Sequence, residues 1–467
     1  MKRTFINKAS AKSSNYGRLP AGLTGREEWK TKVLPNIPFF HSSIYYRNVV
    51  VTGFLFILFF TISLSSNAQY YNPFQPYYPH SKNLAGAYAE YTIGSNSITA
   101  DMVNSLFLGK YLTTAMKNEV TSKLKNMNNA GGDANAVVFY SYRPDTSAKG
   151  KNVGFWFSVK SRNHADTRFS KDLYKLTFYG NKQFEGTTAD ISDFNFNLIQ
   201  FQQFQVGVSK KINKGEATYG AGLSLLNGQN YHSLHAPKAL LYTAPGGDYI
   251  DFNSDIIYRL SDTTAKKFGT SNGIGTGLDL YADIAYKTEK NHKEHIIIEV
   301  KDMGMIWWGK KSFIMDRDTV FRFDGIRVNN IFNIQNQYFS NTNKDSIINN
   351  LTPLKRKFFS STLPTTFNFY TISIFGKLQL VKGFRYIFNA NSKLNLFVNS
   401  NYFFSKHISA SLGVSYGGYS KFNVYCGVGV NVGKGFVFNA YSNNIEGFIL
   451  PKKALAQGLY VSLLKFF

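Results

Sequence analysis

The stretch ISASLGVSY, residues 408–416, and the stretch FNVYCGVGVNV, residues 422–432, alternate between two kinds of side chain. In each, every second residue is apolar or aromatic, and the residues between are mostly Ser, Gly or Asn. Successive side chains of a β-strand point to opposite faces, so this period of two predicts strands with one apolar and one polar face. A run of about 10 residues is also the length of a tilted strand that crosses a bilayer. We therefore predict that these strands close the wall of a transmembrane β-barrel, with the apolar face outward.

The same alternation recurs upstream, at residues 153–162, 204–209 and 219–225. Short turns alternate with longer polar connections, the longest at residues 227–272 and 309–364. This asymmetry is typical of the two ends of an outer-membrane barrel. The sequence predicts an all-β, antiparallel barrel of about 14 strands, with 12 to 16 as the range.

Composition agrees with a barrel and argues against a helical membrane protein. Aromatic residues make up 16% of the 467 residues, with Phe 42 and Tyr 30, and aromatics favour strands and membrane interfaces. The mean hydropathy is only −0.22, because half of a barrel's strand residues face away from lipid. The single cysteine, Cys426, excludes an intrachain disulfide.

The formal net charge is +25. Basic residues are spread over loops and strand ends without a basic helix, so lipid phosphate of the outer membrane or anionic glycolipid is a better expected partner than nucleic acid. A solvated basic surface remains the open alternative.

The N-terminal region reads as a leader. Residues 1–48 are basic and contain prolines, so they are expected to be an extension outside the fold. Residues 49–64 are almost continuously apolar, and small residues follow, so residues 49–68 are predicted to be a signal peptide cleaved after Ala68. The alternative is a membrane anchor, for which the 16-residue core (49 to 64) is short of the ~20 residues needed. The sequence leaves open whether residues 1–46 are translated at all.

Residues 69–130 are predicted to be an N-terminal segment that precedes the barrel of residues 131–467. Within this segment one amphipathic helix is expected at residues 101–125, with an apolar residue every fourth position. One apolar stripe implies packing on one partner, either as a plug in the lumen or as part of a loop.

Successive side chains of a strand alternate between the two faces of the wall, and this alternation (parity) identifies candidate lumen residues. Tyr281 and Asp283 continue the face of the glycines at 273, 275 and 277, and Tyr425 lies on the polar face of its strand. Lys160 and Arg162 are expected at the lumen or its rim, where they would favour anions or be solvated.

Two further motifs, a pair of tryptophans and a cluster of His and Glu, give no catalytic or metal-binding prediction. Trp307 and Trp308 are expected at the membrane interface, the level that amphipathic rings prefer. His292, Glu294 and His295 are metal-capable but are expected in an exposed turn, so no metal, cofactor or catalytic residue is predicted.

Several motifs together resemble a known family. They are GIGTGLDL at residues 273–280, DMGMIWW at residues 302–308, and Gly180-Asn181 with Phe184 and Gly186, with Phe467 ending the chain. The chain resembles an uncharacterised, domain-of-unknown-function family of outer-membrane barrels from Bacteroidota, similar in build to FadL-like and PorV-like barrels. The resemblance implies a barrel of about 14 strands and no established substrate.

The expected function is to bind or pass hydrophobic or amphipathic small molecules by passive diffusion across the outer membrane. A second hypothesis is a docking barrel, PorV-like, that holds a secreted or surface protein. A third, an enzyme within the barrel, lacks a recognisable set of nucleophile, base and orienting group.

Overall fold

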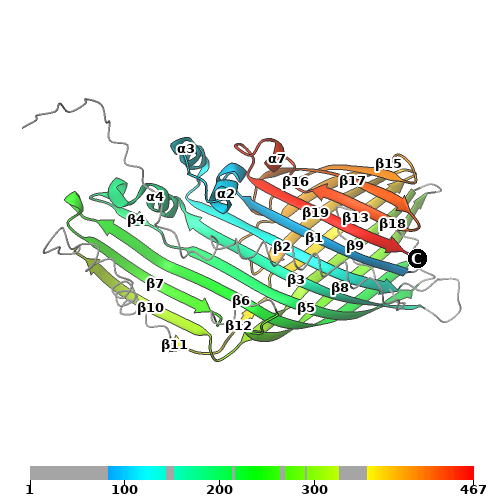
Figure 1. Ribbon diagram of the computed structural model, residues 1–467, viewed down its shortest axis with the longest axis horizontal. Coiled ribbons are helices and arrows are strands. Elements are labelled where there is room, and N and C mark those ends of the chain that lie inside the picture. The colour runs from blue at the N-terminus through cyan, green and yellow to red at the C-terminus, as the bar shows by residue number, and fades with distance from the viewer. Residues whose placement is uncertain (1–82, 143–151, 213–215, 263–268, 290–291, 325–354) are drawn as a thin grey trace, which may run out of the picture.

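The computed structural model describes residues 83–142, 152–212, 216–262, 269–289, 292–324 and 355–467. In these ranges, 14 antiparallel strands close into one barrel (Figure 1). In order around the wall they are β1 (Asn83–Ser95), β2 (Met127–Tyr142), β3 (Val153–Ser170), β5 (Phe194–Ile212), β6 (Ala217–Thr243), β8 (Gly273–Glu289), β9 (His292–Trp308), β13 (Thr365–Phe375), β14 (Leu378–Phe388), β15 (Asn395–Phe403), β16 (Ile408–Tyr416), β17 (Phe422–Gly433), β18 (Phe436–Ser442) and β19 (Ala456–Phe466). The ring closes where β1 pairs with β19, from Leu84 opposite Phe466 to Gly94 opposite Ala456. The predicted fold and strand number are confirmed.

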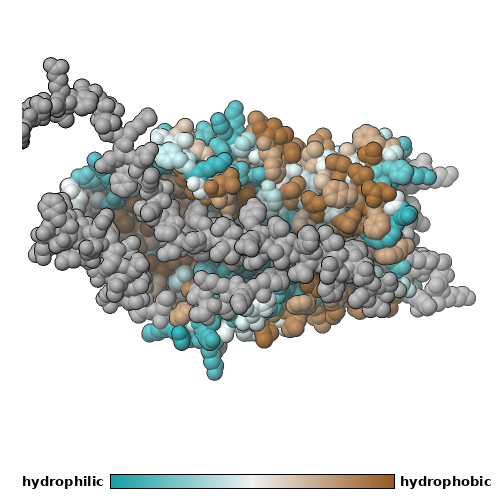
Figure 2. Space-filling model, in the orientation of Figure 1, coloured by the Kyte–Doolittle hydropathy of each residue, from teal (hydrophilic) through white to brown (hydrophobic). Residues whose placement is uncertain are grey.

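The apolar face of the alternating strands points outward, as predicted. Leu412 is 62% exposed and Phe422 is 59% exposed, whereas their neighbours Ser411 and Asn423 are buried. Figure 2 shows apolar surface spread over the outside of the barrel wall. Cys426 lies on this outward face.

The two ends of the barrel differ. At one end, which we name the turn end, successive strands join through short turns, such as residues 376–377 between β13 and β14. The opposite end, named the loop end, holds the longer connections with helices α2 (Ala100–Phe107), α3 (Thr114–Lys123), α4 (Lys171–Tyr179) and α7 (Glu446–Ile449) (Figure 1). Two short 3-10 helices, η1 (Asn181–Phe184) and η3 (Pro245–Gly247), also lie in these connections.

The helix expected at residues 101–125 is two helices in the structure. Thr99 caps α2 by accepting a hydrogen bond from the Met102 amide, and Gly109 ends the turn that follows with a φ of 62°, a conformation glycine adopts without strain. Thr113 then caps α3 in the same way. The two helices pack with α4 on the loop-end residue Phe169, so of the two expected positions, plug and loop, they occupy the loop. In the described part of the chain, no helix is both long and apolar enough for a membrane crossing.

The expected domain boundary at residue 131 is wrong, because β1 already belongs to the barrel wall. In the stretch NLAGAYAEYTIGS of β1, the outward face carries Ala at 85, 87 and 89, while Leu84 and Tyr88 face inward, so the apolar-outward alternation is hidden. The predicted extension at residues 1–48, the signal peptide at 49–68 and the cut after Ala68 lie outside the described residues.

The two long connections expected to be loops contain strands. β6 is 27 residues long, about 90 Å at ~3.3 Å per residue, and its second half runs beyond the wall. There it pairs with β4 (Thr188–Asp190) and β7 (Ile250–Leu260), and β7 pairs with β10 (Phe313–Phe323). We name this extension the projecting sheet. β11 (Lys355–Arg356) adds to β10, and β12 (Phe359–Thr362) adds to β9.

Inside the barrel, aromatic rings lie over glycines of neighbouring strands. A Cβ added at Gly427 would lie 1.6 Å from the Tyr441 ring, at Gly207 2.2 Å from the Trp156 ring, and at Gly220 2.1 Å from the Tyr281 ring. Glycine leaves the space that each ring fills, so the interior is packed by matching ring and glycine. At the turn end the interior is an aromatic cluster, in which the rings of Tyr425, Tyr441 and Tyr460 stack in sequence at 5.8 and 6.1 Å.

Candidate functional site

The inward face of β3 carries a row of functional side chains at every second residue. From the turn end to the loop end it presents Lys160, Arg162, His164 and Asp166, and of these only Arg162 is not fully buried. Each reaches strands or loops elsewhere in the wall, so one strand face organises the lumen.

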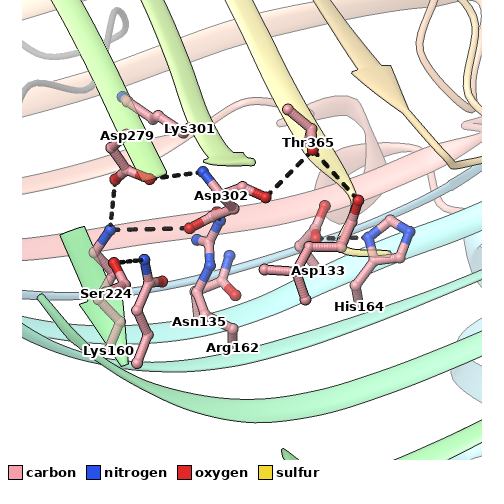
Figure 3. Close-up of polar contacts among 12 residues, drawn as sticks. Asp133, Asn135, Lys160, Arg162, His164, Ser224, Asp279, Lys301, Asp302 and Thr365 are labelled. Carbon is pink, nitrogen blue, oxygen red and sulfur yellow. Dashed lines mark hydrogen bonds and ion pairs between the residues drawn. The ribbon is translucent and has the colours of Figure 1, made fainter. Parts of the chain in front are cut away.

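Lys160 and Arg162 form the deeper part of this row (Figure 3). The Lys160 ammonium lies 3.0 Å from a carboxylate oxygen of Asp279 on β8 and 3.9 Å from Asp302 on β9. Arg162 donates to the other oxygen of Asp302. Because β5 and β6 separate β3 from β8 in the wall, these ion pairs cross lumen space.

The four charges cancel, which is the condition under which buried ions are tolerated. The Asp302 amide donates to Asp279 at 2.7 Å, so the two carboxylates are joined through the backbone as well. We name Lys160, Arg162, Asp279 and Asp302 the ion-pair network.

Asp302 reaches the lumen because β9 carries a β-bulge. Leu278 pairs with Met303 but Leu280 pairs with Val300, so Lys301 and Asp302 together face Asp279. Asp302 has a φ of 59°, in the left-handed region that Asp and Asn enter more readily than other residues with a Cβ. The bulge aims Asp302 inward and reverses which residues of β9 face the lumen beyond it.

Asp166 is the hub of a second set of contacts nearer the loop end. Its carboxylate accepts hydrogen bonds from the Asn391 amide at 2.7 Å, the Asn391 side chain at 2.9 Å and the Tyr419 hydroxyl at 3.3 Å. His164 Nε2 lies 3.4 Å away, and its Nδ1 lies 2.9 Å from Asp133. Asn391 joins β14 to β15 and Tyr419 joins β16 to β17, on the side of the barrel opposite β3.

Tyr419 is a neutral donor in this set. Burial, reinforced by the Asp166 and Asp133 carboxylates, raises the pKa of its hydroxyl well above the ordinary value, so the proton needed for its hydrogen bond to Asp166 is retained. We name Asp133, His164, Asp166, Asn391 and Tyr419 the cross-lumen latch, because it holds two loops of one wall to the facing wall.

Between latch and ion-pair network lies a small cavity. It measures about 20 Å³, and its lining includes Asp133, Arg162, His164 and Asp302. A water molecule needs roughly 10–15 Å³ by this measure, so the cavity admits water but no larger solute in this conformation. In the described ranges, no three His, Cys, Asp or Glu side chains converge to hold a metal ion.

Residues 83–441 match the model of a family of unknown function, DUF5723. The protein belongs to this family. The expectation of a family without an assigned function is thereby confirmed. No curated protein matches the chain.

Among solved structures, the DUF5723 barrel is similar to a mutant of the monoaromatic hydrocarbon channel TodX, at 11% identity and a TM-score of 0.42, over 84% of this chain and 91% of that one. It is similar to the toluene transporter TbuX of Ralstonia pickettii, at 8% identity and a TM-score of 0.38, over 83% and 90%. It is also similar to a FadL homologue of Pseudomonas aeruginosa, at 10% identity and a TM-score of 0.35, over 82% and 89%. At these identities the likeness assigns no substrate.

Of the lumen residues expected from parity, Tyr281 packs its ring 5.7 Å from that of the buried Trp156, and Tyr425 is buried in the turn-end aromatic cluster of the DUF5723 barrel. Asp283 lies 2.8 Å from His295. Glu294 and His295 lie on strand β9 rather than in an exposed turn, and Glu294 accepts a hydrogen bond from Ser373. The side chain of His292 is outside the described residues.

Two expectations need correction. Trp307 is 49% exposed, as an interface residue would be, but Trp308 is 1% exposed and donates to Ser361 inside the barrel. Adjacent residues of a strand face opposite sides, so only one of the two indoles can lie on the outside of the wall. Lys160 and Arg162 are not free cations that favour anions, because Asp279 and Asp302 neutralise them.

Sequence reasoning missed the latch entirely. His164 and Asp166 continue the alternation that predicted Lys160 and Arg162, so extending that row by four residues would have identified them. Nothing in the sequence pairs them with Asn391 and Tyr419, which are 225 and 253 residues from Asp166.

Replacing Asp166 by Asn tests the latch. Asn keeps the size of the side chain but loses the charged acceptor, so residues 389–394 and 417–421 are expected to exchange amide hydrogens about tenfold faster, since a hydrogen bond to a charged group contributes ~1.5–3 kcal/mol. Hydrogen–deuterium exchange of the detergent-solubilised protein measures this. The control Asp193→Asn removes the exposed partner of Arg168 and should change neither segment; unchanged exchange in Asp166→Asn would show that the loops are held by other contacts.

Proposed function

We propose that this DUF5723 protein is an outer-membrane barrel that passes small amphipathic molecules by diffusion, and that the ion-pair network and the cross-lumen latch close the path at rest. Substrates enter at the loop end, pass the polar section formed by β3, and leave along the aromatic cluster at the turn end.

Placement in the membrane is supported by the outside of the wall. Exposed apolar side chains follow the outward face of successive strands; Leu223, Val206, Leu412 and Val428 are among them. Such a band would be an aggregation hazard in water and is the surface that lipid covers. The asymmetry of turn end and loop end has the form of an outer-membrane barrel, whose short turns face the periplasm.

The observation that carries the proposal is that the contacts made across the lumen by the inward face of β3 are polar and join distant strands. A permanent core gains most from apolar packing, whereas ion pairs and hydrogen bonds can be exchanged for contacts with water or a polar solute. A passing solute would meet charged side chains on β3, from Asp166 to Lys160, and then the ring faces of Tyr425, Tyr441 and Tyr460. A solute with one charged and one aromatic or apolar end matches both sections in turn.

Uptake into vesicles tests the proposal. The wild-type protein in phospholipid vesicles is expected to admit an aryl sulfonate, which lipid alone excludes, several times faster than a neutral sugar of similar mass. Protein-free vesicles give the background. Uptake of both solutes at that background rate would refute passage of small molecules.

The second candidate function is docking of a secreted or surface protein. The projecting sheet favours it, because β6, β7 and β10 extend ordered backbone beyond the barrel at the loop end (Figure 1). Background uptake by vesicles, together with a stoichiometric protein partner that is lost when the projecting sheet is shortened, would favour docking over passage.

A further inference from the structure

Lysines gather at the turn end in one sector of the rim. Lys377, Lys406 and Lys434 lie in the three successive turns between β13 and β18, and Lys465 lies near the end of β19. We name these four residues the lysine sector.

Hydrogen bonds place the elements of this sector side by side. The Phe403 amide donates to the Lys377 carbonyl, the Asn431 amide to the His407 carbonyl, and the Phe466 amide to the Gly435 carbonyl, at 2.9, 2.7 and 2.7 Å. Each turn is therefore bonded to the strand end that follows, and the lysines form one continuous arc of the rim.

Within its own turns and strand ends, this arc contains no carboxylate side chain to neutralise its positive charge. The segments 375–379, 403–409, 431–437 and 463–467 contain no Asp or Glu. In the described structure Lys377 donates to the Phe404 carbonyl, and Lys465 donates to the Lys434 carbonyl. Lys465 also lies 4.3 Å above the centre of the Phe436 ring.

Cations at the loop end and in the projecting sheet differ, because several have acidic partners. Arg322 forms two hydrogen bonds of 2.7 Å with Asp251, Lys123 pairs with Glu119, and Arg168 lies 4.0 Å from Asp193. The lysines of the lysine sector, by contrast, have no acidic residue within their own turns and strand ends.

Exposed apolar side chains border the lysine sector on the outside of the wall. They are Phe375, Phe404, Ile408, Val432 and Phe467. Apolar and aromatic groups next to lysines form the pattern of a membrane interface, where ammonium groups extend from an apolar surface to the headgroups. Figure 2 shows hydrophilic residues bordering the apolar wall near this end.

We propose that the lysine sector binds the anionic headgroups of phospholipids in the periplasmic leaflet. The partner is a phospholipid rather than an anionic glycolipid, because short turns lie on the periplasmic side of an outer-membrane barrel and glycolipid occupies the other leaflet. The inference rests on the membrane placement in the proposed function but not on passage of a solute.

Lipid selectivity of the full chain tests the inference. The protein is reconstituted in phosphatidylcholine vesicles with about one fifth phosphatidylglycerol, and spin-labelled lipids report which headgroup the wall prefers. Wild-type protein is expected to prefer phosphatidylglycerol roughly fivefold, the effect of one lysine near a headgroup. The triple variant K377Q/K406Q/K434Q should lower the preference to less than twofold, and salt should weaken the wild-type preference.

The matched control is K310Q/K311Q/K452Q, which removes three exposed lysines at the loop end and should leave the preference unchanged. Heat-dependent gel mobility verifies that each variant is folded. An unchanged preference in the turn-end variant would overturn the inference, as would its loss in the control. A preference only for vesicles that carry anionic glycolipid would overturn it too. Failure of solute uptake with the lipid preference intact would refute passage alone.

Discussion

Replacing Asp302 by Asn is expected to raise the ionic conductance of the barrel several-fold and to make it anion-selective. Asp302 faces Arg162 and Lys160, and its side chain is 1% exposed. Without its charge, two cations share only Asp279, and the repulsion between them opens the network. A lumen lined by unpaired cations favours anions.

Replacement by Asn removes the negative charge without changing the backbone conformation. Asn tolerates the positive φ of 59° at this bulge position, so the course of β9 should be preserved. Leaving a buried charge without its partner costs about 3–5 kcal/mol, which should also lower the stability of the barrel. Single-channel recording in planar bilayers with unequal salt concentrations measures conductance and selectivity together.

Asp251→Asn is the control for Asp302→Asn. It also removes a carboxylate from an ion pair, with Arg322, but in the projecting sheet. Conductance and selectivity should match the wild type. If Asp302→Asn also behaves as the wild type does, the ion-pair network does not limit passage, and the constriction must lie at the latch or the aromatic cluster.

The second large effect is expected from Gly427→Ala. The added Cβ would lie 1.6 Å from Cδ1 of Tyr441, whose ring is 2% exposed and packed between Tyr425 and Tyr460. The ring has no free space to move into, and overpacking of this kind costs about 1–3 kcal/mol. The urea midpoint of the protein folded in lipid vesicles should fall accordingly, or the barrel should fail to fold.

Gly277→Ala provides the comparison on the same, inward face of the wall. Its Cβ would meet Ser224 at 3.6 Å, an ordinary contact, and the loss of backbone freedom in the unfolded chain contributes about 0.4–1 kcal/mol in favour of folding. Its urea midpoint should equal or exceed that of the wild type. In the double variant Gly427→Ala/Tyr441→Ala the clash is absent. Its loss of unfolding free energy should therefore be smaller than the sum of the losses in the two single variants, and a loss equal to that sum would contradict the packing argument.

Several parts of the fold could not be predicted from the sequence. β7 and β10 were expected to be loops because NSD in one and DRD in the other break the apolar alternation. The barrel strands alternate because one face is apolar and points outward from the wall, whereas these two strands extend beyond the wall. The helix at 101–125 was expected to be continuous because its apolar spacing persists through the break at Gly109, and spacing alone does not identify a cap.

The candidate site divides in the same way. Parity identified Tyr281, Asp283 and Tyr425, and it identified Lys160 and Arg162 as a pair. The expectation for Trp308 was wrong because it came from the preference of amphipathic rings for the membrane interface, whereas adjacent residues of a strand face opposite sides. The bulge at Asp302, which shifts the lumen face of β9 by one residue, leaves no mark in an alternating pattern.

The sequence by itself determined that the chain forms a barrel of about 14 strands, and which face of its alternating strands points outward. These follow from a period of two and from strand length, which are local properties of the chain. Only the tertiary structure decided which inward residues meet. Asp166 joins Asn391 and Tyr419, and Lys160 joins Asp279, because closure of the ring and the register between strands bring opposite walls to the same height. That height is set by all the strand pairings together, so no single stretch of sequence contains it.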